Sequence, residues 1–252
     1  GQCAAADQDE AETGDRKGKQ LMLDVSRKEL KYIVSPREIA LLKRRLAPLM
    51  QSDPHNAGGG AGYRVRSLYF DTPFDTDYEE KRDGYLERRK IRLRIYDPRD
   101  TSAKLELKEK KGDFQRKRSL LLSRTEAECM IRGAYGFLRE REEELALGLY
   151  LLMTQKCYRP KCVVEYDRFA YCLKQNETRV TFDTGLRSGE GRYDIFDKDL
   201  MLYPVGGIMD HTMEVKFNGF LLTYLKNELN RCQGMPASHS KYCMARMVTK
   251  GG

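Results

Sequence analysis

Lysine and arginine recur at every second position in several short segments of this chain. In one segment Lys90, Arg92 and Arg94 alternate with isoleucine and leucine. Side chains two residues apart in a β-strand point to the same face, so each such segment predicts a strand with one apolar and one charged face. Similar alternation places charged residues at Glu29, Lys31, Lys104, Glu106, Lys108, Lys110, Arg116, Arg118, Glu214 and Lys216. Arginine binds two phosphate oxygens through its planar fork and lysine acts as a point charge, so the pattern favours a site for a phosphate-rich anion.

A solvated sheet face is the alternative for any one of these strands. Such a face normally mixes neutral polar residues with its charges, whereas these faces hold almost none. A closed antiparallel barrel of about eight strands explains the pattern if the charged faces point inward and helices pack on the apolar outer faces. Burying cations without counter-charge is costly, so we expect a bound polyanion or ordered water inside.

Carboxylates are few on the charged faces: Glu29, Glu106, Glu165 and Glu214. Among phosphate-binding cations they indicate a divalent metal ion, held by one or two carboxylates together with phosphate oxygens. A simple ion pair with a neighbouring lysine or arginine is the alternative for each glutamate.

The elements that must position these residues follow from periodicity and capping signals. Capping boxes at Ser35 and Ser123 predict helices over 36–46 and from 123 to about 156, the second interrupted near Gly133. Further helices are expected over 220–232 and 238–248, with a short helix or turn over 74–85. Strands are expected over 24–34, 63–70, 88–96, 103–110, 115–122, 158–173, 178–183, 191–196 and 211–218. Because helices fall between groups of strands, the fold class is α+β on an antiparallel sheet.

Composition and length limit the number of domains and the classes of ligand that this chain can have. The chain has 252 residues, a net charge of +8 and 40% hydrophobic residues, which suits one globular domain that meets a polyanion. Residues 1–22 predict a disordered leader and residues 23–250 a single domain. The 7 cysteines form no CxxC pair, which argues against a zinc site and favours free thiols in a reducing compartment. No apolar run is long enough to span a membrane, and no signal peptide is visible.

Seven segments in order resemble the VTC domain of the triphosphate tunnel metalloenzyme superfamily: residues 27–32, 66–72, 91–96, 105–108, 179–183, 213–217 and 240–242. The resemblance implies a tunnel of eight antiparallel strands, transfer of the γ-phosphate of ATP to a phosphate chain, and Mn²⁺ or Mg²⁺ as cofactor. The candidate catalytic residues are Lys31, Arg92, Arg94, Lys108, Arg179, Lys216 and Lys241. The candidate phosphate-binding residues are Lys90, Lys110, Arg118 and Ser240. The candidate metal ligands are Glu214 and Glu29.

One position departs from the related CYTH-type triphosphatases, which open with two glutamates and a lysine at alternate positions. Here the first is Arg27, followed by Glu29 and Lys31. The resemblance therefore favours a polyphosphate polymerase, with a triphosphatase or a non-catalytic polyphosphate- or nucleotide-binding module as alternatives. The expected partners are ATP and polyphosphate, with a possible membrane-protein partner and no nucleic acid, because no reader motif is present. We expect a cytoplasmic protein. If it has that membrane partner, the partner would place it at the inner face of the membrane. The sequence does not indicate an oligomeric state.

Overall fold

The computed structural model describes residues 27–56, 62–112, 114–207, 211–238 and 240–250. Within them, eight long strands form one antiparallel sheet: β1 (Arg27–Val34), β3 (Tyr63–Asp71), β4 (Glu87–Ile95), β5 (Ser102–Lys111), β6 (Phe114–Ser123), β7 (Arg159–Leu173), β8 (Thr178–Gly189) and β10 (His211–Asn218). The sheet also includes three two-residue strands: β2 (Gln51–Ser52), β9 (Tyr203–Pro204) and β11 (Met235–Pro236). The predicted α+β class is confirmed. The predicted leader, residues 1–22, lies outside the described residues.

Six α-helices accompany the sheet in the described part of the chain: α1 (Pro36–Leu46), α2 (Thr76–Arg82), α3 (Arg124–Ile131), α4 (Glu144–Gln155), α5 (Thr223–Asn230) and α6 (Lys241–Lys250). Both predicted capping boxes are present, at Ser35 with Glu38 and at Ser123 with Glu126. The predicted helix after Ser123 divides into α3 and α4 because Gly133 adopts a φ of 77°, which ends α3. No helix among these residues is long and apolar enough to cross a membrane.

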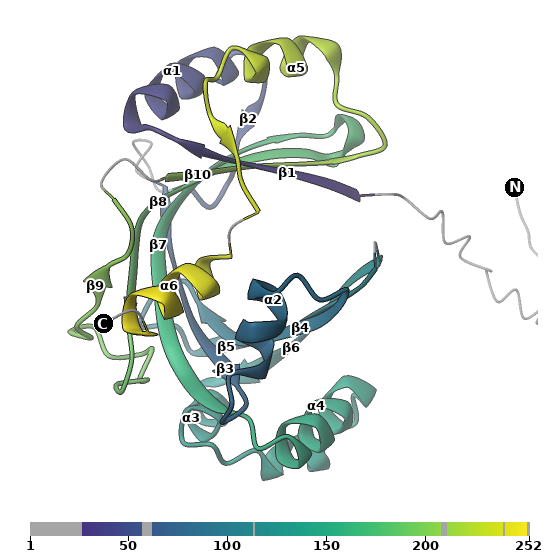
Figure 1. Cartoon of the computed structure of the whole chain (residues 1–252), viewed down its shortest axis with the longest axis vertical. Coiled ribbons are helices and arrows are strands. Elements are labelled where there is room, and N and C mark those ends of the chain that lie inside the picture. The colour runs from purple at the N-terminus through teal and green to yellow at the C-terminus, as the bar shows by residue number, and fades with distance from the viewer. Residues whose placement is uncertain (1–26, 57–61, 113, 208–210, 239, 251–252) are drawn as a thin grey trace, which may run out of the picture.

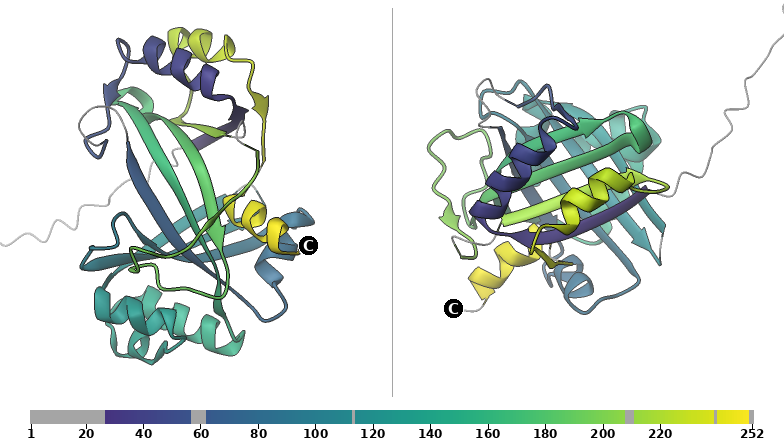
Figure 2. Two further views of the ribbon diagram at one scale, coloured as in Figure 1. Left: turned by 90° about the vertical axis from the view of Figure 1, so that its left-hand side faces the viewer. Right: turned by 90° about the horizontal axis from the view of Figure 1, so that it is seen from above.

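The apolar faces of most strands pack outward against helices, as predicted. One cluster joins α1 and α5 to β8 and β10, with Leu42 and Val215 fully buried. A second cluster joins α3 and α4 to β4, β5 and β6, with Met130 and Leu93 fully buried. Figures 1 and 2 show these helix pairs at opposite ends of the molecule, with the curved sheet between them. Each buried leucine contributes about 1.5–3 kcal/mol, so the outer clusters fix which face of each strand points inward.

Helix α6 is an exception to the prediction that helices lie outside the sheet. Its Tyr242 packs with Val65 and Val164 on the opposite, concave face of β3 and β7, where α2 also contributes. The Tyr242 hydroxyl donates a hydrogen bond of 2.6 Å to the buried carboxylate of Asp71. The amphipathic pattern of residues 238–248 predicts a helix but not the side of the sheet that receives it. The helix fills part of the concavity and brings Lys241 into it.

Backbone hydrogen bonding in the sheet follows the order β11-β1-β10-β8-β7-β3-β4-β5-β6 and does not return from β6 to β1 within the described residues. The predicted closed barrel is therefore not confirmed. The free edge of β1 pairs with β11 at Tyr32 and Ile33, so its backbone groups there are already used. The sheet nevertheless curls until Lys108 Nζ on β5 lies 3.9 Å from Glu29 Oε2 on β1. Side chains, rather than backbone, bridge the opening.

One predicted strand, over residues 191–196, is wrong. Strand β8 continues to Gly189, and the following segment is a loop. Ile195 and Phe196 of this loop are buried in the outer core, and Arg66 donates to the Ile195 carbonyl at 3.0 Å. The apolar side chains that suggested a strand are buried by packing in the outer core. The Ile195 carbonyl is satisfied by Arg66 instead of by a neighbouring strand.

Candidate active site

The charged face of each long strand lines the concave side of the sheet. Pairing places Lys90 opposite Lys108 and Arg92 opposite Glu106, and directly opposed residues share a face. The cations here, together with one from α6, include Lys31, Lys90, Arg92, Arg94, Lys108, Lys110, Lys117, Arg168, Arg179, Lys216 and Lys241. The carboxylates among them are Glu29, Glu106, Asp183 and Glu214. We call this set the cationic interior; its excess of positive charge favours an anionic ligand.

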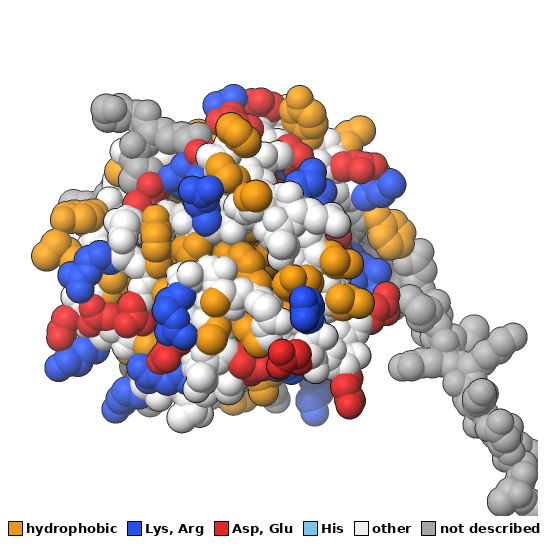
Figure 3. Space-filling view, turned by 90° about the horizontal axis from the view of Figure 1, so that it is seen from below, with side chains coloured by type: hydrophobic (Ala, Val, Ile, Leu, Met, Phe, Trp, Pro, Cys, Tyr) orange, Lys and Arg blue, Asp and Glu red, His pale blue; other side chains and the backbone are white. Residues whose placement is uncertain are grey.

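One outer face lacks such a separation of charge. Seen from below, the face over α3 and α4 shows apolar, basic and acidic side chains side by side (Figure 3). The contrast indicates that the cations on the concave side are gathered by the fold and do not simply reflect a basic composition.

At the centre of the cationic interior, Lys31 lies between two carboxylates. Its Nζ is 2.9 Å from Glu29 Oε1 and 3.5 Å from Glu214 Oε1. Glu214 also contacts Lys216 at 3.0 Å and Lys241 at 3.7 Å. Three predicted lysines, from β1, β10 and the start of α6, therefore meet at the buried carboxylate of Glu214, and Lys31 links it to Glu29.

The charge state of this centre is set by mutual attraction. Burial alone would raise the pKa of Glu214, but Lys241, Lys216 and Lys31 hold that pKa well below its usual value. Burial alone would likewise lower the pKa of Lys241, but Asp183 and Glu214 raise it. Lys241 Nζ lies 2.6 Å from Asp183 Oδ2. At neutral pH Glu214, Asp183, Lys31 and Lys241 are therefore all charged.

Arg92 and Arg94 converge on Glu106 of β5. Arg92 Nε lies 2.6 Å and Arg94 Nη2 3.3 Å from Glu106 Oε2, and Lys117 of β6 contacts Oε1. Burial would raise the pKa of Glu106, but Arg92, Arg94 and Lys117 hold it at about 2. Arg92 also donates to the Tyr69 hydroxyl at 3.0 Å. The two arginines share a face, as predicted, and Glu106 orients both of them.

Lys90 lies in a different environment. It donates a hydrogen bond to Ser240 Oγ, just before α6, and within the described residues no ion pair joins it to a carboxylate. Burial, together with the like charges of Lys81, Lys31 and Lys108, lowers the pKa of Lys90 to about 7. A bound anion would restore the charged form.

Two other predicted residues share the inward face but lie away from the centre. Arg179 faces Lys216 across the β8–β10 pair, and its Nη2 lies 2.7 Å from Asp53 Oδ2 and donates to the Tyr63 hydroxyl at 3.1 Å. Lys110 follows Lys108 on the inward face of β5. Both extend the cationic interior beyond the carboxylates at its centre.

Arg118 lies outside the cationic interior, contrary to prediction. It is opposite Leu107 on the outer face of the β5–β6 pair, and its Nη2 is 2.9 Å from Glu109 Oε2. Its neighbour Lys117 has the inward position instead. Since basic residues occupy both faces of this segment, alternation alone does not decide which one points inward. Glu165 also faces outward, where its Oε2 accepts from Arg66 Nε at 2.6 Å.

Arg168, Asp183 and Lys117 belong to the site but are not predicted from the sequence. Arg168 donates to Asp183 through Nε and Nη2, at 2.6 and 2.7 Å. On β7 the inward series Tyr166, Arg168 and Ala170 contains a single charge, which gives no alternating pattern of cations. Asp183 belongs to a segment that carried the family resemblance, but its ion pair with α6 is a tertiary contact.

The residues present fit a divalent ion that arrives with phosphate. In the described part of the chain, no group of three or more His, Cys, Asp or Glu side chains is placed to hold a metal by itself. Mg²⁺ is commonly bound by one or two carboxylates plus substrate phosphates, and Glu214 and Glu29 both approach Lys31. A phosphate chain could attract that ammonium group and leave both carboxylates to a metal ion.

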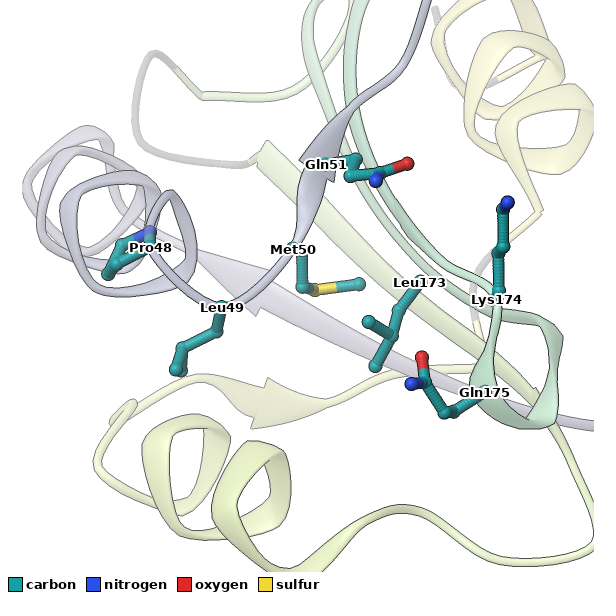
Figure 4. Close-up of a pocket in the computed structure, with 7 residues that line it drawn as sticks. All are labelled: Pro48, Leu49, Met50, Gln51, Leu173, Lys174 and Gln175. Atoms are coloured by element: carbon teal, nitrogen blue, oxygen red, sulfur yellow. The ribbon is translucent and has the colours of Figure 1, made fainter.

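A hollow between the ends of α1 and β7 is less suited to phosphate (Figure 4). Its volume is about 360 Å³, and its lining comprises Pro48, Leu49, Met50, Gln51, Leu173, Lys174 and Gln175. Lys174 is the one charged residue in this lining, which does not provide the cation cluster that a phosphate chain requires.

Known proteins resemble this chain in sequence pattern and in fold. A family model described as "VTC domain" matches residues 26–250. HpAC1 from Hippeastrum, a candidate adenylyl cyclase described as having a dominant triphosphatase activity, is 13% identical with a TM-score of 0.54, over 87% of this chain and 95% of that chain. A candidate adenylate cyclase from Bacillus halodurans is 14% identical with a TM-score of 0.49, over 85% and 96%. At such identities the structural likeness to HpAC1 shows the fold alone. None of the curated proteins matches the chain.

Proposed function

This chain belongs to the VTC domain family, and we propose that it is a polyphosphate polymerase that transfers the γ-phosphate of ATP to a growing polyphosphate chain. The observation that carries the proposal is the convergence of Lys31, Lys216 and Lys241 on Glu214. These groups come from two adjacent strands and a distant helix, so the fold gathers them at one point. A bound phosphate chain would form ion pairs with these lysines in place of the carboxylate of Glu214.

Phosphoryl transfer needs positioning of the reacting groups and neutralisation of charge on the phosphoryl oxygens. Arg92 and Arg94, held in place by Glu106, offer planar forks for phosphate oxygens, while Lys31 and Lys108 supply point charges. We further propose that the curved sheet encloses the phosphate chain as a tunnel, closed on one side by contacts such as Lys108 with Glu29.

A divalent ion, Mn²⁺ or Mg²⁺, would be held by Glu214 with Glu29 and would neutralise phosphate oxygens when bound. Because Lys31 contacts both carboxylates, we expect metal binding to be weak without phosphate. Calorimetric titration of Mn²⁺ with and without tripolyphosphate would measure this difference.

The direct test is to incubate the protein with ATP and Mn²⁺ and to follow the products by phosphorus NMR. The expected products are ADP and a polymer with internal phosphate resonances. Orthophosphate as the sole phosphorus product besides ADP would identify a triphosphatase instead. Tight tripolyphosphate binding without turnover would identify a binding module.

A substitution at Glu214 separates binding from catalysis. Glu214→Gln removes the proposed metal ligand while leaving the lysines, so we expect loss of turnover with tripolyphosphate binding unchanged or tighter. Glu228→Gln on α5, where the carboxylate contacts Arg45 and Arg231, is the matched control and should keep full activity. Full activity in Glu214→Gln would contradict the metal-ligand role.

We propose ATP and polyphosphate as the ligands of this protein, without a role for nucleic acid. We also propose a cytoplasmic location, with a membrane protein as the partner that holds the domain at the inner face. Secretion of the protein in a fractionation experiment would contradict this location.

A further inference from the structure

The β5–β6 turn and the start of β4 form a tip that exposes large apolar side chains. Tyr85 is 60% exposed, Leu86 71% and Phe114 72%. The Gly112 N–H donates to the Leu86 carbonyl at 3.1 Å, and Phe114 lies opposite Lys111, so the backbones of these segments adjoin at the tip. We propose that this tip, comprising residues 85–89, 111–112 and 114–116, docks on an anionic phospholipid bilayer. The intervening Asp113 lies outside the described residues.

The shape of the tip favours a bilayer over a peptide. Figure 1 shows the ends of β4, β5 and β6 projecting at the side of the molecule where β1 begins, clear of helices α3 and α4. A turn that projects in this way can insert its side chains into the headgroup region of a membrane. Tyrosine suits that depth because its ring meets acyl chains while its hydroxyl meets water, and leucine and phenylalanine side chains gain free energy in contact with the acyl chains.

The charge of the tip supplies the second argument. Outside the cationic interior its described residues carry one acidic side chain, Glu87, and four basic side chains: Arg88, Arg89, Lys111 and Arg116; in the sequence, Asp113 adds one further acidic residue. Glu87 pairs with Lys111 at 3.2 Å, but both side chains remain largely exposed, at 70% and 81%. Each basic residue near an anionic membrane surface strengthens binding about fivefold, and this attraction falls off within a Debye length.

The exposed leucine of the tip favours a bilayer over a nucleic acid as its ligand. Basic residues and the rings of Tyr85 and Phe114 could serve either ligand, but Leu86 has no ring to stack on a base. An aliphatic side chain exposed beside basic residues gains free energy in contact with acyl chains. The proposal does not depend on the activity proposed for the cationic interior.

The sequence offers a clean spectroscopic test, because the chain contains 0 tryptophan residues. In Phe114→Trp the single indole should shift its emission to shorter wavelength when the protein meets vesicles of phosphatidylcholine with about one third phosphatidylserine. Vesicles of phosphatidylcholine alone should give no shift. Leu147→Trp, on the 49% exposed position of α4, is the matched control and should not respond to either vesicle.

Sedimentation with the same vesicles gives an independent measurement. The double variant Leu86→Ser, Phe114→Ser should lower the partition coefficient onto anionic vesicles by at least about tenfold. The control Leu147→Ser, Leu151→Ser removes two other exposed leucines and should bind like the unmodified chain. Because the substituted tip residues are exposed, thermal unfolding should be unchanged, which guards against a folding defect.

Three outcomes would overturn the proposal. The first is equal partition of the tip variant and its control, and the second is an unmodified chain that does not bind anionic vesicles. The third is an emission shift in Phe114→Trp produced equally by an RNA oligonucleotide at the same ionic strength, which would identify the tip as a nucleic-acid contact.

Discussion

Lys90 on β4 donates a hydrogen bond to the hydroxyl of Ser240, and so joins the cationic interior to the segment before α6. Lys31, Lys81 and Lys108 surround this lysine with like charge, and together with burial they lower its pKa to about 7. Most cations near the centre are already neutralised by carboxylates. Lys90 can therefore respond to an anionic ligand by gaining a proton.

Binding of tripolyphosphate at about pH 8 should take up nearly one proton at Lys90. The free protein holds this lysine largely neutral above its pKa of about 7, and the bound anion favours the ammonium form. The apparent affinity should therefore fall as pH rises above about 7. Calorimetry in two buffers of different ionisation enthalpy measures the uptake, which should vanish in Lys90→Met and persist in Lys110→Met. Undiminished uptake in Lys90→Met would contradict the assignment.

Adjacent basic residues on β6 should differ sharply in their effect. Lys117 points into the cationic interior, while Arg118 pairs with Glu109 outside it. We expect Lys117→Gln to weaken tripolyphosphate binding about tenfold, or about 1.4 kcal/mol, and Arg118→Gln to change it less than about twofold. Calorimetric titration of both variants provides the measurement. A larger effect from Arg118→Gln would show that the register of β5 and β6 is wrong.

Arg92→Ala or Arg94→Ala should reduce turnover at least about tenfold, since each removes a charge-assisted contact to phosphate. The melting temperature should change little, because Glu106 keeps the other arginine and Lys117 as partners. A scan of melting temperature beside the activity assay separates the two effects. Intact activity with a lower melting temperature would mean that the arginines serve structure alone.

Leu93→Asp is the matched substitution on the other face of the same strand. Leu93 is 0% exposed in the outer core, so an unpaired carboxylate there should destabilise the fold by about 3–5 kcal/mol. Urea unfolding followed by circular dichroism would measure the loss. A variant that remains as stable as the unmodified chain would contradict the outward assignment of this face.

Buried Asp77 should make stability depend on pH. Burial and the nearby Asp71 raise the pKa of Asp77 from 3.8 to about 8, so the folded state holds a proton that the unfolded chain releases. The free energy of unfolding should therefore fall as pH rises between these values, by at most about 1.4 kcal/mol per pH unit. Asp77→Asn should remove this dependence because an amide does not titrate. The amide oxygen can still accept the hydrogen bond from Tyr158, so the fold should be kept. Urea unfolding from about pH 6 to about pH 9 tests it.

Alternation and capping were sufficient to predict much of the fold. The eight long strands, the helices that begin at Ser35 and Ser123, and the shared face of Arg92 and Arg94 all follow from local rules. These features depend on backbone geometry and on the apolar face of each strand, which the sequence encodes locally. The same rules failed at residues 191–196, where apolar side chains pack in a loop, and at Arg118, where both faces of the strand carry basic residues.

The sequence by itself determined which side chains alternate and therefore which strands carry a charged face. Tertiary structure decided how those faces meet: Lys241 reaches Asp183 because α6 packs inside the concavity, and Arg168 joins them across β7 and β8. It also left the sheet open: within the described residues β6 does not pair with β1, and β11 pairs with part of the edge of β1. Local pattern fixes the direction of a side chain relative to its own strand, whereas contacts between distant segments depend on how the whole sheet curves and which helix enters it.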